Sequence, residues 1–252
     1  MKASVIIPSL NQGSFIGHTL SSLRSQTFRN FEALLMDGGS TDDTLDIAAT
    51  FADVLTDVVS EPDSGQSQAI NKGFLRAQGD FVAWLNSDDY YFPYTLHWVS
   101  HLFQTHPQVE ALVGDNLLVD SALSPFHLGR GEWRGLERFL MYWRPYNMHQ
   151  PSIFFKRRLL ERVGLLREDL HLIMDYDYWF RVGRTSGFHT SGILLSASIR
   201  HGGTKTKPDF SNYHQEIRSA WREYLQQVPV MMRSRLLIQG KIVKLSQKLK
   251  QA

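Results

Sequence analysis

The chain has 252 residues, enough to bury a substantial core as one large domain or as one domain with an appendage. A hydrophobic fraction of 42% and a charged fraction of 21% are ordinary for a soluble globular protein, and no apolar run approaches the roughly 20 residues that span a bilayer. Because the sequence contains no cysteine, disulfides and thiolate metal sites are excluded.

The amino-terminal half alternates apolar runs with segments of helical periodicity. Met1 leads almost directly into the first apolar run, so we expect a strand there rather than a targeting segment. Strands are predicted at residues 4–7, 31–36, 58–59 and 81–85, and helices at 15–23, 41–52 and 64–74. Strands separated by helices indicate βαβ units and a mainly parallel sheet, whose right-handed crossovers place the strand-to-helix loops on one edge.

Four polar loops follow these strands, at residues 8–12, 37–43, 61–66 and 86–89. The edge where such loops meet is the place where open α/β folds bind ligands. In the last loop Asp88 and Asp89 follow a buried strand, and hard carboxylate ligands suit Mg²⁺ or Mn²⁺ holding a phosphate group. The alternative is a solvated turn in which the two acids cap the next helix. The convergence of four polar loops favours the metal site.

The second half is less regular. Residues 110–119, 152–155 and 193–195 are predicted as strands, residues 133–143 as an aromatic helical stretch, and residues 175–182 as an apolar helix. The sequence contains no internal repeat and no linker long enough to separate a second globular domain.

Five motifs, in this order, resemble the inverting glycosyltransferases of family 2, which have the GT-A fold. They are SVIIPSLNQ at 4–12, DGGSTD at 37–42, EPDSGQSQAINKG at 61–73, LNSDD at 85–89 and MDYDYW at 174–179. The resemblance extends over residues 3–206. It implies an α/β fold with a mostly parallel, Rossmann-like sheet flanked by helices.

The same resemblance suggests how the chain is divided. We expect a GT-A domain at 1–206, with a nucleotide-sugar-binding half at 1–119 and an acceptor and catalytic half at 120–206. A helical, basic extension follows at 207–252.

The resemblance implies a donor site at the loop edge. Its predicted residues are Pro8, Ser9, Asn11, Asp37, Asp63, Gln66, Asn71, Asn86 and Ser87. A carboxylate such as Asp37 is suited to accept a hydrogen bond from a uracil or guanine ring N–H, although a turn former beside Gly38 is the alternative. Asn71 has the alternative of a local cap or packing residue.

A divalent metal, Mn²⁺ or Mg²⁺, is implied at the diphosphate. The segment 86–88 occupies the position of the family's Asp-x-Asp motif, but its first residue is the amide Asn86. Asp88 is the expected metal ligand, with Asp89 as a second ligand or an orienting partner. His201 resembles a late histidine that contacts the metal or the diphosphate, with a structural histidine as the alternative, and Lys205 either neutralises phosphate or is merely exposed.

Inverting transfer requires one base that deprotonates the acceptor hydroxyl. Asp175 matches the catalytic aspartate of the family's acidic pair, whose preceding acid is Met174 here. Asp177 competes for the role because it lies two residues away. The structural alternative for both is the favourable placement of an acid at a helix amino terminus.

The carboxyl-terminal segment is basic and amphipathic. From position 231 onward it has no acidic residue and contains Arg233, Arg235, Lys241, Lys244, Lys248 and Lys250. The formal net charge of +2 is therefore due to the basic residues of this segment. We do not expect the rest of the chain to bind nucleic acid through its charge. A helix here either lies on an anionic membrane or packs on the body or another subunit.

These features together predict an inverting transferase that moves a sugar, with a UDP-sugar as the favoured donor, to a hydroxyl of a glycan or lipid-linked glycan. We expect it in the cytoplasm or at the cytoplasmic face of the inner membrane. One alternative is a catalytically silent homologue that binds nucleotide or glycan, because of Asn86 and Met174. A sugar nucleotidyltransferase is disfavoured because residues 8–13 contain no Lys or Arg for a triphosphate loop.

Overall fold

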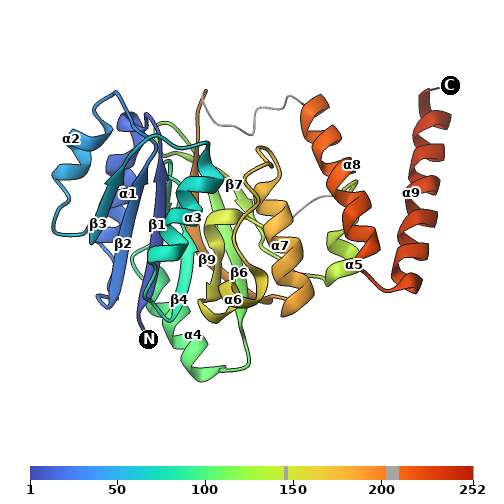
Figure 1. Cartoon of the computed structure of the whole chain (residues 1–252), viewed down its shortest axis with the longest axis horizontal. Helices are drawn as coiled ribbons and strands as arrows, with labels where there is room; N and C mark the ends of the chain where they lie inside the picture. The colour runs from blue at the N-terminus through green and yellow to red at the C-terminus, as the bar shows by residue number, and fades with distance from the viewer. Residues whose placement is uncertain (145–146, 203–209, 252) are drawn as a thin grey trace.

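The computed structural model describes residues 1–144, 147–202 and 210–251. Within these ranges a nine-stranded sheet is covered by helices (Figure 1). The strands are β1 (Ala3–Ser9), β2 (Phe31–Asp37), β3 (Asp57–Ser60), β4 (Phe81–Trp84), β5 (Asp89–Tyr91), β6 (Ala111–Asp120), β7 (Pro125–Gly129), β8 (Ile153–Lys156) and β9 (His189–Arg200). The helices are α1 (Gly13–Arg24), α2 (Thr44–Ala49), α3 (Gln66–Arg76), α4 (Thr95–Thr105), α5 (Leu136–Phe139), α6 (Arg158–Val163), α7 (Met174–Thr185), α8 (Phe210–Gln226) and α9 (Val230–Gln251), with a 3-10 turn η1 at Gln150–Ser152.

The strand order is β3-β2-β1-β4-β8-β6-β9-β5, and β7 pairs with β6. The first four strands are parallel, as are β6 and β9, which confirms the predicted α/β class. The remaining pairings, which involve β5, β7 and β8, are antiparallel. In the parallel part Ser9 lies beside Asp37, and Asp37 lies beside Ser60, so three predicted loops start from neighbouring positions.

Both faces of β1, β2 and β4 are buried, which explains their nearly continuous apolar runs. Side chains alternate between the faces: Ile6 of β1 packs in one core cluster, whereas Val5 and Ile7 pack in the other. The first cluster joins α3 and α7 to the sheet, and the second joins α1 and α4 to its opposite face. A Cβ at Gly73 of α3 would lie 2.4 Å from an Ile6 methyl, so only glycine permits this close approach.

The second half departs from the sequence expectations in two segments. The predicted helical stretch at 133–143 contains only the short α5, which begins after Gly135 with φ of +86°. The predicted strand at 193–195 extends to the twelve residues of β9, because its ends pair with β6 and β5 although they carry few apolar side chains.

The carboxyl-terminal helices lie beyond α7, at the end of the molecule opposite β3 (Figure 1). Helix α8 packs into the same core as α7, where the rings of Tyr224 and Phe180 stack with their centroids 4.1 Å apart. Helix α9 buries Leu236 but leaves Met231 and Ile238 exposed. The expected boundary at residue 206, between the GT-A domain and the helical extension, stays a prediction. Among the described helices, none has the length and apolar character that crossing a membrane requires.

Candidate active site

The loop after β2 is organised by Asp37. Its carboxylate is 2% exposed and accepts hydrogen bonds from the N–H groups of Gly39 and Ser40, and from the hydroxyls of Ser40 and Ser60 at 2.5 and 2.6 Å. Four donors thus already satisfy the side chain that we expected to bind a nucleobase. In this structure Asp37 shapes the loop that borders the predicted donor site.

The loop after β1 is hydrogen-bonded to the loop after β2. Asn11, in the left-handed region with φ of 52°, donates its N–H to Ser40 Oγ and accepts from the N–H of Thr41 at 2.8 Å. Pro8 and Ser9 are buried, and the Ser9 hydroxyl has no hydrogen-bond partner within the part of the chain that the structure describes. A buried hydroxyl without a partner at a sheet edge is suited to receive a ligand.

The loop before α3 brings Asp63 against the glycine loop after β2. A Cβ at Gly38 would lie 2.7 Å from an Asp63 oxygen, so the missing side chain leaves the room that the carboxylate occupies. The other Asp63 oxygen accepts from the N–H of Gly65, the residue that precedes α3. Asp63 therefore lies beside the Asp37 loop, as expected for residues of one site.

Three side-chain amides form a chain across the carboxyl end of β4. Gln150 Nε2 donates to the backbone carbonyl of Trp84 at 2.7 Å, so its Oε1 must accept, and it does so from Asn86 Nδ2 at 3.0 Å. Asn86 Oδ1 in turn accepts from Gln66 Nε2 at 2.8 Å. An aspartate at position 86 lacks the N–H that Gln150 requires, which gives a physical reason for the amide in the metal motif.

Two predicted donor residues hold the scaffold together. Asn71 is 4% exposed, and its amide bonds to both backbone groups of Leu166 and to the carboxylate of Glu168. Ser87 is 3% exposed and donates to the carbonyl of Pro8 at 3.1 Å. The structure therefore brings Asn71 to the 166–168 segment rather than to the loop edge, and Ser87 ties the loop after β4 to β1.

Asp88 and His201, which are 113 positions apart, meet at the loop edge. Asp88 Oδ2 lies 3.2 Å from His201 Nε2. The imidazole ring stacks on Phe15 of α1 with centroids 4.0 Å apart, which fixes its orientation. Both side chains are partly exposed, so an incoming ligand has access to them.

Asp89 points away from this pair, into the protein. It belongs to β5, is 5% exposed and hydrogen-bonds with Ser198 and Asn86. Burial raises the pKa of its carboxyl well above the usual range, and the charge of Asp88 raises it further. The placement fits an orienting partner and does not fit a second metal ligand.

The donor set for a divalent cation is thus one carboxylate and one imidazole. Within the described residues, no three Asp, Glu, His or Cys side chains are grouped so as to hold a metal ion. A carboxylate oxygen and an imidazole nitrogen suit Mn²⁺ or Mg²⁺ when phosphate oxygens and water complete the coordination. Asp88 and His201 therefore fit a metal that is held jointly with a diphosphate. Lys205 lies outside the described residues.

Asp175 is a partly buried carboxylate at the amino terminus of α7. Burial raises its pKa to about 6, and the N–H of Tyr176, which donates to Oδ1 at 2.7 Å, opposes the shift. None of the described basic residues forms an ion pair with Asp175. A carboxylate with a raised pKa and no ion pair among the described residues is suited to accept a proton near neutral pH.

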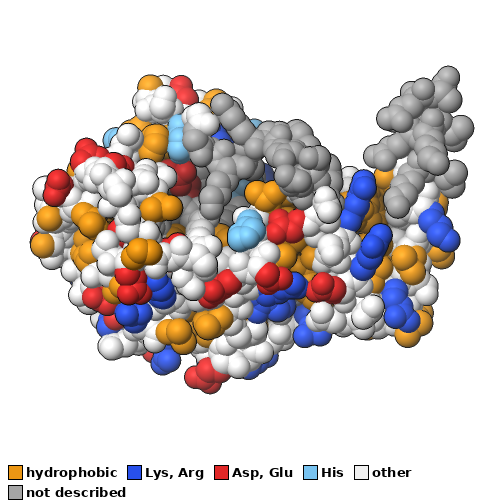
Figure 2. Space-filling view, turned by 45° about the horizontal axis from the view of Figure 1, so that its top comes forward, with side chains coloured by type: hydrophobic (Ala, Val, Ile, Leu, Met, Phe, Trp, Pro, Cys, Tyr) orange, Lys and Arg blue, Asp and Glu red, His pale blue; other side chains and the backbone are white. Residues whose placement is uncertain are grey.

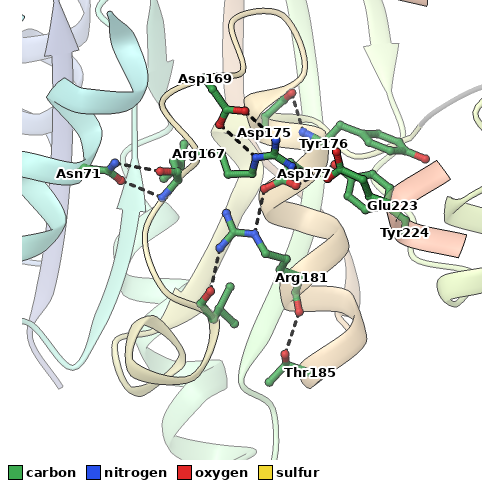
Figure 3. A network of polar contacts seen from close by, with 12 residues as sticks. Asn71, Arg167, Asp169, Asp175, Tyr176, Asp177, Arg181, Thr185, Glu223 and Tyr224 are labelled. Atoms are coloured by element: carbon green, nitrogen blue, oxygen red, sulfur yellow. Dashed lines mark hydrogen bonds and ion pairs between the residues drawn. The ribbon is translucent and has the colours of Figure 1, made fainter. Parts of the chain in front are cut away.

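Asp177, the competing candidate, is fully engaged (Figure 3). It is 2% exposed, accepts from Arg181 Nε at 2.9 Å on one oxygen and accepts from the hydroxyl of Tyr224 at 2.8 Å on the other. The charge is neutralised within α7, and the second bond reaches α8. Asp177 therefore has a structural role that the sequence alone did not reveal.

The sequence matches the family described as "Glycosyl transferase family 2" over residues 4–164. Among curated relatives, an uncharacterized glycosyltransferase of Rickettsia conorii is 25% identical over 232 residues, which are 89% of this chain and 38% of that protein. A glycosyltransferase of Mycobacterium bovis named for PGL/p-HBAD biosynthesis is 31% identical over 185 residues, covering 71% and 68% of the two chains. The chain thus spans less than half the length of the Rickettsia relative.

Solved structures share the fold at low sequence identity. Staphylococcus aureus TarS superposes with a TM-score of 0.68 at 20% identity, over 94% of this chain and 42% of TarS. Residues 1–349 of TarS in complex with UDP-GlcNAc give 0.67 at 18% identity, over 94% and 70%. Mannosyltransferase PcManGT of Pyrobaculum calidifontis, in complex with GDP-Man and Mn²⁺, gives 0.61 at 17%, over 97% and 80%. These likenesses confirm the expected GT-A-type fold.

Proposed function

This chain belongs to glycosyltransferase family 2, and from that premise we propose that it transfers a sugar from a nucleotide-diphosphate donor to an acceptor hydroxyl with inversion at the anomeric carbon. The observation that carries the proposal is the contrast between two acids on α7. Asp175 has a raised pKa and no ion pair among the described residues, whereas Asp177 is buried and neutralised by Arg181. Asp175 is the general base of this proposal.

Inversion follows from a single displacement. Asp175 takes the proton of the acceptor hydroxyl, and the resulting oxygen nucleophile attacks the anomeric carbon from the face opposite the diphosphate. The diphosphate leaves with the bonding electron pair and needs positive charge nearby. A divalent cation bound by Asp88 and His201 supplies that charge when present, and the Asp89 carboxyl, buried behind them, orients the Asp88 loop.

The donor of this proposal lies along the carboxyl ends of β1, β2 and β4. Pro8, Ser9, Asn11, Asp37, Asp63, Gln66, Asn86 and Ser87 form or support this edge. The Ser9 hydroxyl, buried and without a described partner, is the group we assign to direct donor contact. A UDP-sugar is the favoured donor, with GDP-sugars second, because structural neighbours are complexes with UDP-GlcNAc and with GDP-Man.

A direct test is a thermal-shift screen of UDP-, GDP- and dTDP-sugars with and without Mn²⁺. A donor at about 100 times its dissociation constant stabilises the native state by roughly 2.7 kcal/mol. The matching donor is then given to acceptors, and the anomeric configuration of the product is read by NMR. A product of inverted configuration supports the proposal. A retained configuration, or the absence of stabilisation by every donor, contradicts it.

We further propose that α9 brings the enzyme to an anionic membrane that carries its glycan or lipid-linked acceptor. Ile238 and Ile242 are each 59% exposed and lie one turn apart on α9, with Lys241 beside them. Figure 2 shows basic and apolar side chains gathered at this end of the molecule. Apolar residues flanked by cations are typical of helices that lie on anionic lipid surfaces.

Liposome flotation of the full chain tests this association. Ile238→Asn combined with Ile242→Asn is expected to release the protein from phosphatidylglycerol vesicles. A matched control is Leu75→Asn, because Leu75 is 73% exposed on α3, away from α9. Equal binding of the Ile238→Asn/Ile242→Asn variant and the wild type contradicts the association.

A further inference from the structure

A pocket of about 230 Å³ opens beside the amino terminus of α7. The segment that contains α5 forms one wall, Tyr176 of α7 forms the floor, and Tyr213 and Ile217 of α8 complete it. The pocket therefore requires the carboxyl-terminal extension, because α8 supplies part of its lining.

Asp175 lies between this pocket and the donor edge. The preceding residue, Met174, receives a hydrogen bond from Ser67 at the start of α3, where it helps to line a smaller pocket with Gln66. The following residue, Tyr176, lines the larger pocket. Consecutive residues of α7 thus face the donor side and the larger pocket. Along α7, Asp175 therefore lies between a residue of the smaller pocket and a residue of the larger one.

Aromatic rings line much of the pocket. Phe139 stacks on Tyr176 with centroids 4.5 Å apart, and the Tyr176 hydroxyl donates to the carbonyl of Phe139 at 2.8 Å, so α5 is held firmly against α7. Trp133 packs against Phe139, and Tyr142 lies at the partly exposed rim. Concave sites that combine aromatic faces with a few polar groups are typical of ligand pockets.

Cationic charge dominates the polar lining. Among the described residues that line the pocket, three are arginines, Arg134, Arg138 and Arg144, and one is an acid, Glu132, which pairs with Arg134 at 2.7 Å. Burial lowers the pKa of Arg138, and the charges of Arg144 and Arg134 lower it further, which reflects the proximity of three guanidinium groups. Like charges gathered in a pocket repel one another, and an anion relieves that repulsion.

We propose that this pocket is the acceptor subsite and that it selects an acceptor sugar carrying an anionic substituent, a carboxylate or a phosphate. The inference rests on the proposed transfer function and names the substrate class of the same site. The sugar ring packs on the aromatic wall, the anion lies among Arg134, Arg138 and Arg144, and the reacting hydroxyl faces Asp175. A neutral acceptor sugar has no anionic group for these guanidinium groups to bind.

Isothermal titration of the full-length protein with three glycosides tests the assignment. The probes are p-nitrophenyl glucuronide, p-nitrophenyl glucoside and the 6-phosphate of that glucoside, which differ only at carbon 6 of the sugar. A charge-assisted bidentate contact is expected to favour one or both anionic probes over the neutral one on the order of tenfold. The stronger of the two identifies carboxylate or phosphate as the substituent. Equal affinity for all three overturns the proposal.

Two variants test whether the arginines of the pocket cause the preference for anionic probes. Arg138→Gln combined with Arg144→Gln is expected to bring the affinity of the anionic probes to that of the neutral glucoside. Arg144→Gln alone, at an exposed position, is expected to lose part of the preference and guards against misfolding of the pair. The matched control is Arg218→Gln, which removes the same charge from an exposed position of α8 that does not line the pocket. A preference that survives in the double variant, or is lost in the Arg218 variant, overturns the assignment.

Further measurements on the same protein preparation distinguish failure of the acceptor inference from failure of the proposed function. Thermal stabilisation by the nucleotide-sugars is measured in parallel. If a donor binds and is transferred to a neutral glycoside as readily as to the anionic ones, only the acceptor inference fails. If no donor binds or is turned over, the proposed transfer function fails, and the pocket loses its assignment as an acceptor subsite whatever anions it binds.

Discussion

The hydroxyl of Tyr224 donates a 2.8 Å hydrogen bond to Asp177, and this bond joins α8 to the helix that carries Asp175. The ring of Tyr224 stacks on Phe180 of the same helix, so α8 contacts α7 through both polar and aromatic contacts. Because Tyr213 and Ile217 of α8 also line the arginine-rich pocket, the helix after residue 206 helps to build the site. Helices α7 and α8 therefore form one packed unit.

Tyr224→Phe is expected to lower the free energy of unfolding by about 1–2 kcal/mol, because it removes one hydrogen bond from a buried carboxylate. Urea denaturation measures the loss. Tyr90→Phe, which removes the hydroxyl of a partly exposed tyrosine, is the control and is expected to change stability little. Equal stability of wild type and Tyr224→Phe contradicts a supporting role for the bond.

Transfer activity is expected to fall at acid pH with a midpoint near 6. A general base must be deprotonated, and burial raises the pKa of Asp175 to about 6, so kcat/KM declines as pH falls through that value. The pH profile is measured at two saturating Mn²⁺ concentrations. A midpoint that is independent of Mn²⁺ assigns the acid limb to the base, whereas a midpoint that moves with Mn²⁺ assigns it to metal release.

Asp88→Ala and His201→Ala are each expected to weaken Mn²⁺ binding in the presence of UDP by at least about tenfold, since even supporting residues around a metal contribute 10- to 100-fold. The electron paramagnetic resonance signal of free Mn²⁺ reports the binding without turnover. Asp89→Asn keeps the shape of the buried carboxyl and is expected to have a small effect. If Asp89→Asn weakens binding as strongly as Asp88→Ala, Asp89 is a ligand.

Asn86→Asp, although it restores the acid of the family motif, is expected to destabilise the protein by about 1–3 kcal/mol. The carboxylate cannot donate to Gln150 Oε1, which the Trp84 carbonyl holds in place. A double-mutant cycle of Asn86→Ala and Gln150→Ala is expected to give a coupling energy of about 0.5–1.5 kcal/mol in urea denaturation. A coupling energy of zero shows that the amide chain is incidental.

Strands β1, β2 and β4 are predictable because they are buried on both faces and read as apolar runs. By contrast, β5 has three residues and begins with Asp89, and most residues of β9 have small or polar side chains. Such strands are specified by the neighbours with which they pair, and a local sequence window does not contain those neighbours.

The residues of the candidate site also differ in whether a local stretch of sequence predicts their contacts. The loop residues around Asp37 and Asp88 are expected from their position after apolar strands. The amide of Asn71 hydrogen-bonds with Leu166 and Glu168, far along the chain, so its motif position alone does not reveal these contacts. Gln150 is fixed by the backbone of β4 and orients Asn86, and neither contact can be read from the local sequence. The structural use of Asp177 is apparent only once α8 is in place.

If Asp175 is the base and Asp177 a structural acid, Asp175→Asn and Asp177→Asn have opposite effects on turnover and stability. Both variants are compared in single-turnover transfer, normalised to the folded fraction from circular dichroism. Asp175→Asn is expected to stay folded and to lose about 10²- to 10⁴-fold in rate. Asp177→Asn is expected to lose up to about 3 kcal/mol of stability while each folded molecule keeps its turnover. A folded, inactive Asp177→Asn beside a fully active Asp175→Asn contradicts the account.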